Sequence, residues 1–569
     1  MAGGLLNLIA IGNQNIILNG NPTKSFFKTK YVKYTNFGLQ KFRVDQQGQT
    51  SINLNNQTKY NFKIPRYGDL LMDVYLVVTL PTIWSPILKY IYPSTGHTEY
   101  RPYEFQWIKN IGTQLINNIT ISIGGRLIQQ FTGSYIQNMV ERDFDINKKK
   151  LFNLMIGNIT ELTDPANFSN RNNNYPNAFL INDLSNNTIE PSIYSYQLFI
   201  PLNSWFSLSS ALAIPLICLQ YAELEFTFEL RPWNELFTIR DVLYDTILNP
   251  IKYYTDIPRI HCFQNVDENY GFHRFIQQPP YRDLSSNVNY PTNILNLSPD
   301  TDVHLITTQC FLDTEERYIF ANNIQTYLIK LIYEYDFQKI NKANKIKLES
   351  NGLVSSWMWY FQRDDVLYRN EWSNYTNWNY EDIVPNNLIE LTDLNIKNIY
   401  YDEPDLYNDI SKNIFITGFT PTIYQKQNFK SILNNFGIIC DGKYRENLFP
   451  AGIYNRIEKY THNNGFSKDG LYSYNFTLNS NPFIYQPMGA FNTNKFKTIE
   501  FEYNLYANPP IDLSAVNFQV ICDPVTNQII GTTKEPTSIY SYNYNLHIYE
   551  ERYNVLIFQS GVAELLYSR

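Results

Sequence analysis

Histidine and cysteine are scarce in this chain, with 6 His and 5 Cys among 569 residues. No two histidines stand at the i, i+4 spacing that a helical zinc site needs. The cysteines are odd in number and far apart, whereas a disulfide framework needs pairs. The sequence therefore predicts no metal site, no disulfide framework and no bound cofactor, and it favours a reducing compartment.

Motifs for nucleotide or acyl chemistry are also missing. The sequence has no phosphate loop ending in Gly-Lys-Ser or Gly-Lys-Thr, no Gly-x-Gly-x-x-Gly and no Gly-x-Ser-x-Gly. Glu223 and Glu225 lie at strand spacing on one face, and paired carboxylates in such a position could in principle carry out glycosidase chemistry. Because they alternate with apolar Leu224 and Phe226, we interpret them as the solvent face of a strand. We predict no catalytic residue and no enzymatic activity.

Long basic runs and long apolar runs are lacking as well. The net charge is −7, and the longest basic block is Lys148-Lys149-Lys150. Direct binding of nucleic acid is therefore not expected. No apolar run has the length of a membrane span, and the first residues do not match a secretory signal. Without a secretory route, the eight Asn-x-Ser/Thr sequons are weak glycosylation candidates, of which Asn167 and Asn186 are the best.

Aromatic residues are abundant. They make up 16% of the chain, with 46 Tyr and 36 Phe, and such residues favour strands over helices. The run Leu70–Leu80 is mostly apolar and is closed by Pro81, which is typical of a core strand. The clearest helix start is Asp313-Thr-Glu-Glu316, where we expect Asp313 to cap the amide of Glu316. The sequence thus predicts an all-β protein with long loops and a few short helices.

One pattern of segments occurs twice, in the same order. Residues 115–126 resemble 432–443, and each copy ends in a two-residue turn, Gly124-Gly125 or Asp441-Gly442. Such turns are strong hairpin signals, because a type I′ turn needs positive φ at both central residues. Further along, 196–203 with 223–230 resemble 472–479 with 499–505. The length also exceeds what one core usually supports, so we predict a duplicated fold.

The predicted organisation has four parts. An N-terminal arm covers residues 1–26, and the first β-domain covers 27–248. A linker rich in proline covers 249–293, and the second β-domain covers 294–569. Two Asn-rich stretches, Asn167–Asn187 and Asn395–Asn413, show little periodicity and are predicted to be long loops.

Several segments resemble the major capsid protein of nucleocytoplasmic large DNA viruses. They are Met1-Ala-Gly-Gly-Leu-Leu6, Ile64-Pro-Arg-Tyr-Gly-Asp-Leu-Leu71, Leu212-Ala-Ile-Pro-Leu-Ile217 and Tyr553-Asn-Val-Leu556. Others resemble the mimivirus-like branch: Leu80-Pro-Thr-Ile-Trp-Ser-Pro86, Asp313-Thr-Glu-Glu-Arg317, Phe361-Gln-Arg-Asp-Asp-Val366 and Asn370-Glu-Trp-Ser-Asn-Tyr-Thr-Asn-Trp378. The resemblance extends over essentially the whole chain. The family's usual Gly-rich ending is replaced here by Val562-Ala-Glu-Leu565.

The resemblance implies two consecutive eight-stranded antiparallel jelly rolls, a double jelly roll, in a homotrimer of nearly hexagonal outline. Such capsomers would tile the icosahedral shell of a large DNA virus, and the protein would lie in the virion capsid after assembly in the host cytoplasm. Implied partners are neighbouring capsomers, minor capsid proteins and penton proteins. We expect the N-terminal arm to face the inner side of the shell and to touch minor proteins or the viral membrane.

A trimer of this kind needs apolar anchors between its parts. Four tryptophans of the second half are our candidates for an inter-subunit or inter-domain clasp, although ordinary core packing explains them as well: Trp357, Trp359, Trp372 and Trp378. We also expect the loops Asn167–Asn187 and Asn395–Asn413 to project outward or to clasp neighbours.

Two other functions remain open from the sequence. A minor capsid, penton or spike protein could use the same jelly rolls. A carbohydrate-binding or carbohydrate-cleaving β-sandwich could share the many aromatic residues and the sparse charge. The ordered duplication and the terminal motifs favour the main lattice protein over both.

Overall fold

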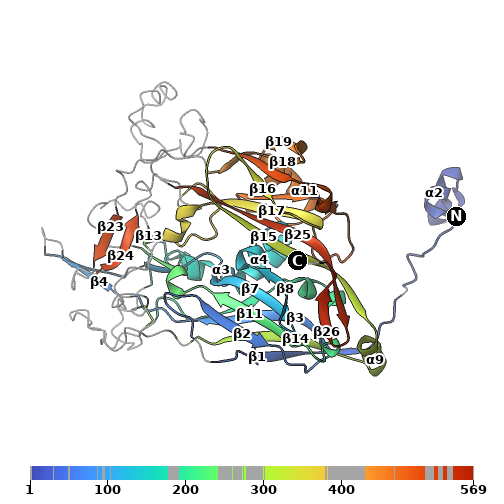
Figure 1. Ribbon diagram of the computed structural model, residues 1–569, viewed down its shortest axis with the longest axis horizontal. Coiled ribbons are helices and arrows are strands. Elements are labelled where there is room, and N and C mark those ends of the chain that lie inside the picture. The colour runs from blue at the N-terminus through green and yellow to red at the C-terminus, as the bar shows by residue number, and fades with distance from the viewer. Residues whose placement is uncertain are drawn as a thin grey trace, which may run out of the picture.

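The computed structural model is a stack of antiparallel sheets with short helices between them (Figure 1). The residues that it describes are 3–29, 31–48, 51–85, 87–91, 96–102, 104–172, 174–176, 191–240, 259–260, 272, 275–276, 299, 301–378, 381, 430–466, 468–506, 518–522, 529–534 and 542–567. The predicted linker of 249–293 lies almost entirely outside them, as does the loop Asn395–Asn413.

Two facing sheets form the first jelly roll. One sheet has the order β1 (Phe37–Asp45), β14 (Val303–Leu312), β3 (Leu70–Leu80) and β10 (Ile214–Pro215), with β9 (Tyr196–Pro201) also paired to β3. The other has the order β2 (Thr58–Lys63), β11 (Leu224–Leu230), β7 (Ile116–Ile123) and β8 (Arg126–Phe131). Alternate residues of β11 are buried, which is the period-two pattern of a strand with one face on a core.

The second jelly roll repeats this arrangement. Its first sheet has the order β15 (Gln325–Ile340), β25 (Tyr544–Gln559), β17 (Leu353–Arg363) and β20 (Leu471–Asn475), with β21 (Phe491–Asn492) and β26 (Val562–Leu565) at the sides. Its second sheet has the order β16 (Asn344–Leu348), β22 (Ile499–Leu505), β18 (Leu433–Cys440) and β19 (Lys443–Pro450). The sequence repeats at 196–203 and 472–479 fall on β9 and β20, which pair with equivalent strands. The predicted duplication and the all-β double jelly roll are confirmed.

Both predicted hairpin turns are present. The turn between β7 and β8 has φ of +57° at Gly124 and +76° at Gly125. The turn between β18 and β19 has φ of +47° at Asp441 and +77° at Gly442. These are the positive φ values that a type I′ turn requires, and they explain why Gly stands at the second position of both turns.

The predicted start of the second domain at residue 294 is wrong with respect to β14. This strand pairs with β1 from His304 to Leu312 and with β3 on its other side, so it belongs to the first jelly roll. The first sheet of this jelly roll is complete only when β14, which follows β12 (Phe237–Arg240) in the chain, takes its place between β1 and β3. Sequence proximity suggested the other domain, because the partners of β14 lie more than 200 residues earlier.

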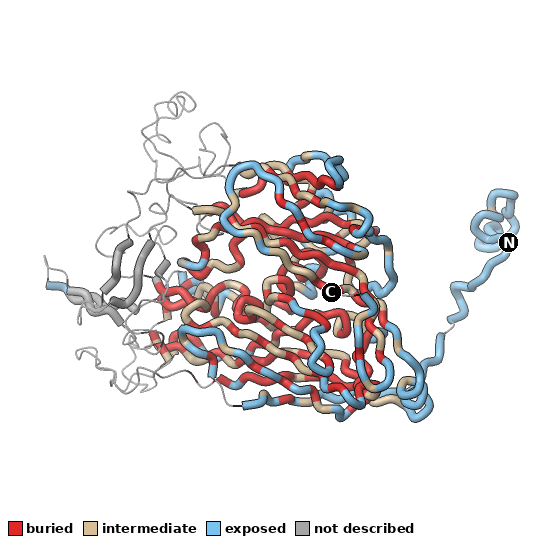
Figure 2. The backbone as a smooth tube through the Cα atoms, viewed as in Figure 1, coloured by how far each residue is buried: buried red, intermediate tan, exposed pale blue. Residues whose placement is uncertain are grey.

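The first sheet of the second jelly roll is buried on both faces. Along β17, Trp357, Trp359 and Phe361 point into the core of the second jelly roll, while Met358 and Tyr360 join the core that contains the first jelly roll. Successive side chains of a strand point to opposite faces, so an unbroken apolar run is what a strand between two cores requires. Figure 2 shows the buried backbone continuing from one half into the other.

Short helices and small sheets complete the described chain. The helices of the first half are α3 (Ile111–Leu115), α4 (Gly133–Asp143), α5 (Ile146–Met155), α6 (Thr160–Thr163) and α7 (Trp205–Leu208), and those that follow are α9 (Thr314–Asn322) and α11 (Glu458–His462). The further strands are β4 (Ile87–Ile91), β5 (Thr98–Pro102), β6 (Glu104–Trp107), β12, β13 (Arg259–Ile260), β23 (Phe518–Cys522) and β24 (Ile529–Lys534). The described part of the chain contains no helix with the length and apolarity needed to span a bilayer.

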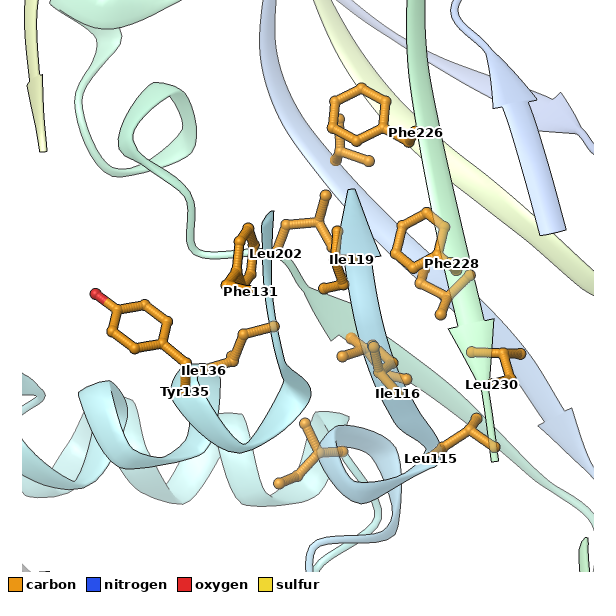
Figure 3. Packing of buried hydrophobic residues seen from close by; sticks show 14 of the residues in the cluster. Leu115, Ile116, Ile119, Phe131, Tyr135, Ile136, Leu202, Phe226, Phe228 and Leu230 are labelled. Atoms are coloured by element: carbon orange, nitrogen blue, oxygen red, sulfur yellow. The ribbon is translucent and has the colours of Figure 1, made fainter. Parts of the chain in front are cut away.

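The predicted helix at Asp313 is present, but its cap differs in detail. The Asp313 carboxylate accepts from the amide of Thr314 at 2.7 Å and not from that of Glu316. Helices α4 and α5, in contrast, were not predicted. They follow β8 and lie against the first core, where Ile136 of α4 packs beside Ile119 of β7 and Phe131 of β8 (Figure 3). The ring of Tyr135, labelled in the same view, meets the Phe131 ring edge-on, with the ring centres 6.0 Å apart.

The N-terminal segment stands apart from the sheets. It consists of α1 (Gly3–Ile9), the 3-10 helix η1 (Asn13–Asn15) and α2 (Ile16–Asn19), and an extended stretch joins it to β1. Figure 1 shows this segment well away from the body, and no described residue of either short helix is buried. Its expected position on the inner side of a shell remains a prediction.

Candidate structural interface between the two halves

Arg142, at the end of α4, is a fully buried guanidinium from the first half that is held by the second half. Its Nη2 donates to Oε1 of Glu551 on β25 at 2.6 Å and to Oδ2 of Asp143 at 2.7 Å. Glu551 also accepts from the hydroxyls of Tyr135 at 2.9 Å and of Ser356 at 3.0 Å. We call this cluster of Tyr135, Arg142, Asp143, Ser356, Ser480 and Glu551 the helix joint.

Charge pairing in the helix joint opposes the cost of burial. Burial would raise the pKa of Glu551, but the positive charges of Arg142 and Lys330 outweigh it and the pKa is lowered. Burial would lower the pKa of Arg142, yet the two carboxylates raise it. For Asp143 burial wins, and its pKa is raised although it accepts from Arg142 and from Ser480 at 2.6 Å. Breaking one partner of such a buried pair leaves an uncompensated charge, which is costly.

Further hydrogen bonds along α4 also cross between the halves. At its start, the Thr132 amide donates to Glu334 of β15 at 2.8 Å. In its middle, Asn138 accepts from the Tyr375 hydroxyl at 2.9 Å. At its end, the Arg142 carbonyl accepts from the amide of Gly465 at 2.8 Å. The whole helix therefore serves as a connector between the two jelly rolls.

A second connection, the loop joint, is the segment Asp364–Trp378 after β17. It is organised by the buried carboxylate of Asp365, which accepts two hydrogen bonds from Arg363 at 2.7 and 2.9 Å and two from Arg369 at 2.8 Å. Bidentate pairing of this kind fixes the planes of all three groups. Burial would raise the pKa of Asp365, but the two guanidinium groups outweigh it and lower the pKa far below the usual range.

The loop joint docks on the end of the first jelly roll. Asn370, with φ of +54°, donates from its side-chain amide to the carbonyls of Asn234 and Phe237, both at 2.9 Å. Trp372 donates from Nε1 to the carbonyl of Glu235 at 2.9 Å. The guanidinium of Arg231 lies over the Trp372 ring, 4.0 Å from its centre. These contacts tie the start of β12 to the second half.

The four tryptophan candidates fall into two groups, one buried in a core and one outside it. Trp357 and Trp359 are wholly inaccessible in the core of the second jelly roll, so the clasp interpretation is wrong for them. Trp357 donates to Glu550 at 2.7 Å, and Trp359 stacks on Phe436. Trp372 lies between the halves, and the Trp378 ring has the Lys430 ammonium 5.3 Å from its centre. A clasp between subunits through Trp372 or Trp378 remains a prediction.

The remaining candidates from the sequence are the acidic pair and the two glycosylation sites. Glu223 and Glu225 both face Lys63, whose Nζ lies 2.6 Å and 3.7 Å from their carboxylates. The hydrogen bond and charge of Lys63 lower the pKa of Glu223, whereas a glycosidase acid needs a raised pKa. Asn167 is exposed and donates to Asp164 at 2.8 Å. Asn186 lies outside the described residues, and the glycosylation of both sites remains a prediction.

Sequence reasoning missed the residues that join the halves. Arg142, Glu551 and Asp365 were not singled out, because the first two are separated by 409 positions and no local pattern links them. The sequence does hold one signal, since the stretches Phe361–Val366 and Asn370–Trp378 resemble segments of the mimivirus-like branch. Both stretches overlap the loop joint, and the first of them begins in β17.

Comparisons with known proteins agree with this architecture. A family model described as the N-terminus of major capsid protein matches residues 25–266. A second, described as large eukaryotic DNA virus major capsid protein, matches residues 316–564. The gap between the two matched regions contains β14.

Individual relatives are similar over most of the chain. Capsid protein 1 of Acanthamoeba polyphaga mimivirus is 28% identical over 364 residues, which cover 63% of this chain and 48% of that protein. The match thus spans about half the length of that relative. Probable capsid protein 4 of the same virus is 24% identical over 558 residues, covering 89% of this chain and 93% of that protein. The major capsid protein of Chrysochromulina ericina virus is 26% identical, covering 64% and 58%.

Solved structures show the same fold. A chain of the PBCV-1 virus capsid matches with a TM-score of 0.58 at 18% identity, covering 96% of this chain and all of that chain. The Faustovirus major capsid protein matches with a TM-score of 0.56 at 11% identity, covering 94% and 93%. At these identities the likeness concerns the fold, and it extends through both jelly rolls.

Proposed function

We propose, on the premise that this chain belongs to the family of large eukaryotic DNA virus major capsid proteins, that it is a structural subunit of a virion shell. The observation that carries the proposal is the repeated jelly roll joined by α4 and by the loop joint. Three copies around a closed three-fold axis would present six similar units, an outline that can tile a flat lattice. A shell subunit functions through its shape. The contacts that fix one jelly roll against the other are therefore its functional residues.

The assembly partners follow from this shape. We expect a homotrimeric capsomer that contacts neighbouring capsomers, with minor capsid and penton proteins at the edges and vertices of an icosahedral shell. Assembly would take place in the host cytoplasm. No catalytic role is expected, and the pairing of Glu223 and Glu225 with Lys63 supports this.

The first experiment is expression of the chain alone, with its mass measured in solution and its outline viewed by negative-stain electron microscopy. A trimer with a nearly hexagonal outline is expected. A well-behaved monomer that does not trimerise at high concentration would contradict the capsomer proposal, and binding to a glycan array would then favour a carbohydrate-binding sandwich.

Location in the particle separates the main lattice from a minor role. An antibody against this chain should label the flat faces of virions. Labelling confined to the five-fold vertices would instead favour a penton or spike protein.

The loops offer a further test of assembly. Shortening Asn167–Asn187 or Asn395–Asn413 should weaken the trimer or the lattice if these loops clasp neighbours. Unchanged trimer dissociation and unchanged particle assembly would contradict that role.

A further inference from the structure

The N-terminal segment exposes a series of apolar side chains, and no described element of the chain covers them. Its exposed apolar side chains retain between 47% and 86% of their accessible surface, and they are Leu5, Leu6, Leu8, Ile9, Ile11, Ile16, Ile17 and Leu18. Contiguous apolar surface on this scale marks a site for a partner or a membrane.

Charge is distributed along this segment in a definite order. No charged side chain occurs before Lys24, and no acidic side chain occurs before Asp45. Four lysines then follow within ten residues, at positions 24, 28, 30 and 33, and aromatic residues alternate with them. Phe26 and Phe27 are fully exposed, and Tyr31 and Tyr34 retain 80% and 86% of their surface.

This order matches the layers of a bilayer surface with negative lipids. Apolar side chains enter the boundary of the acyl chains, aromatic rings prefer the headgroup level, and lysines contact the phosphates. In α1, Leu5, Leu8 and Ile9 share one face, while Gly4 and Asn7 lie on the other, so the helix can lie in the surface plane. All charged side chains before Asp45 are positive. An anionic lipid surface explains this uniform sign, whereas a protein partner does not require it.

We propose that residues 3–34 form an anchor for an anionic lipid surface, with the apolar part inserted and the lysine–aromatic part at the headgroups. This inference rests on the proposed shell function for its setting, since a shell subunit with such an arm would hold a membrane at a fixed distance. Its physical basis is the arm alone, so the two proposals can be tested separately.

The test uses the full chain and vesicles floated through a density gradient. Vesicles of phosphatidylcholine with phosphatidylserine should carry the protein upward, whereas vesicles of phosphatidylcholine alone should carry much less, and added salt should release it. Replacing Lys24, Lys28 and Lys33 by Gln should weaken binding on the order of 100-fold, because each lysine near an anionic surface contributes about fivefold. The triple variant Leu5→Asn, Leu8→Asn and Ile9→Asn should also abolish flotation.

The matched control replaces three exposed lysines of the second jelly roll, Lys345, Lys347 and Lys443, by Gln. It removes the same charge from the body and should bind like the wild type. Equal loss in the control and the arm variant would overturn the proposal, as would a wild-type chain that does not float with anionic vesicles.

The solution mass of every variant is measured in parallel. A trimer that ignores anionic vesicles overturns the lipid anchor and leaves the capsomer proposal intact. Arm variants that lose the trimer, with no vesicle binding by the wild type, would show that a second copy of the chain covers the arm. A monomer whose vesicle binding depends on the arm would support the anchor and contradict the capsomer.

Discussion

The Arg142 guanidinium and the Glu551 carboxylate lie 2.6 Å apart, and this contact joins the last turn of α4 in the first jelly roll to the centre of β25 in the second. Both side chains are almost completely inaccessible to solvent. Any arrangement of the two halves that separates this pair would leave a buried charge without a partner, which is costly.

Replacing Arg142 by Met should therefore leave the Asp143 and Glu551 carboxylates buried without their cation. We expect the free energy of unfolding to fall by about 3–5 kcal/mol. Urea unfolding followed by tryptophan fluorescence measures this change. The control is Arg126→Gln, which removes the exposed ion pair between Arg126 and Glu564 and should cost about 0–1 kcal/mol. Equal effects of the two variants would contradict the assigned role of the helix joint.

Trp372→Ala should weaken the loop joint. It removes the hydrogen bond to Glu235 and the ring under Arg231, and we expect a loss of about 2–3 kcal/mol in unfolding free energy. Trp372→Phe keeps a ring beside Arg231 and loses only the hydrogen bond, so about 1 kcal/mol is expected. The rate of trimer dissociation decides the separate question of a clasp between subunits. If the alanine variant dissociates like the wild type, Trp372 acts within one subunit only.

Lys459 of α11 predicts a dependence of stability on pH. Burial lowers its pKa to about 7, although the charges of Glu141 and Asp469 oppose this shift. Between pH 7 and the ordinary lysine pKa of 10.5, Lys459 is protonated in the unfolded chain and largely neutral in the folded one. The free energy of unfolding therefore rises with pH in that window. Below it, the folded chain bears the full cost of burying a charged lysine. From pH 7 to pH 9 we expect a gain of about 1–3 kcal/mol. In Lys459→Met this gain should be absent when the two unfolding curves are compared at each pH.

Gly465 should not tolerate a side chain. A Cβ at this position would come within 2.5 Å of the backbone of Glu141 and Arg142 at the end of α4. We expect Gly465→Ala to lower the unfolding free energy by more than about 2 kcal/mol through displacement of the helix joint. Gly452→Ala is the matched control, since a Cβ there would meet nothing within 4 Å. Thermal unfolding of the two variants provides the comparison, and a stable Gly465→Ala would show that the contact between α4 and Gly465 is dispensable.

Local features of the fold could be read from the sequence, and long-range ones could not. The turns at Gly124-Gly125 and Asp441-Gly442 depend on the φ preferences of two adjacent residues, so the letters alone identify them. The position of β14 depends on partners in β1 and β3, and nothing within the segment itself encodes them.

The tryptophans also show that the sequence alone does not reveal which surfaces the fold covers. Clustering of Trp357 and Trp359 suggested an interface, but period-two geometry of β17 turns both rings into one core. The run of apolar residues around them already contained the explanation, since a strand with no polar face must be covered on both sides. The helix joint had no such signal, because the carboxylate that pairs with Arg142 lies on the last long strand of the chain.

The sheet of β15, β25, β17 and β20 contributes side chains to two cores, one on each face. This limits the substitutions and rearrangements that the duplicated chain can accept during evolution. Met358, Tyr360 and Tyr549 face the first half, so a copy of the second jelly roll released by gene fission would expose them to water and aggregate. Neither half alone covers both faces of this sheet, so each half depends on the other for a closed core. A substitution on either face of this sheet must therefore fit the side chains that the other half packs against it.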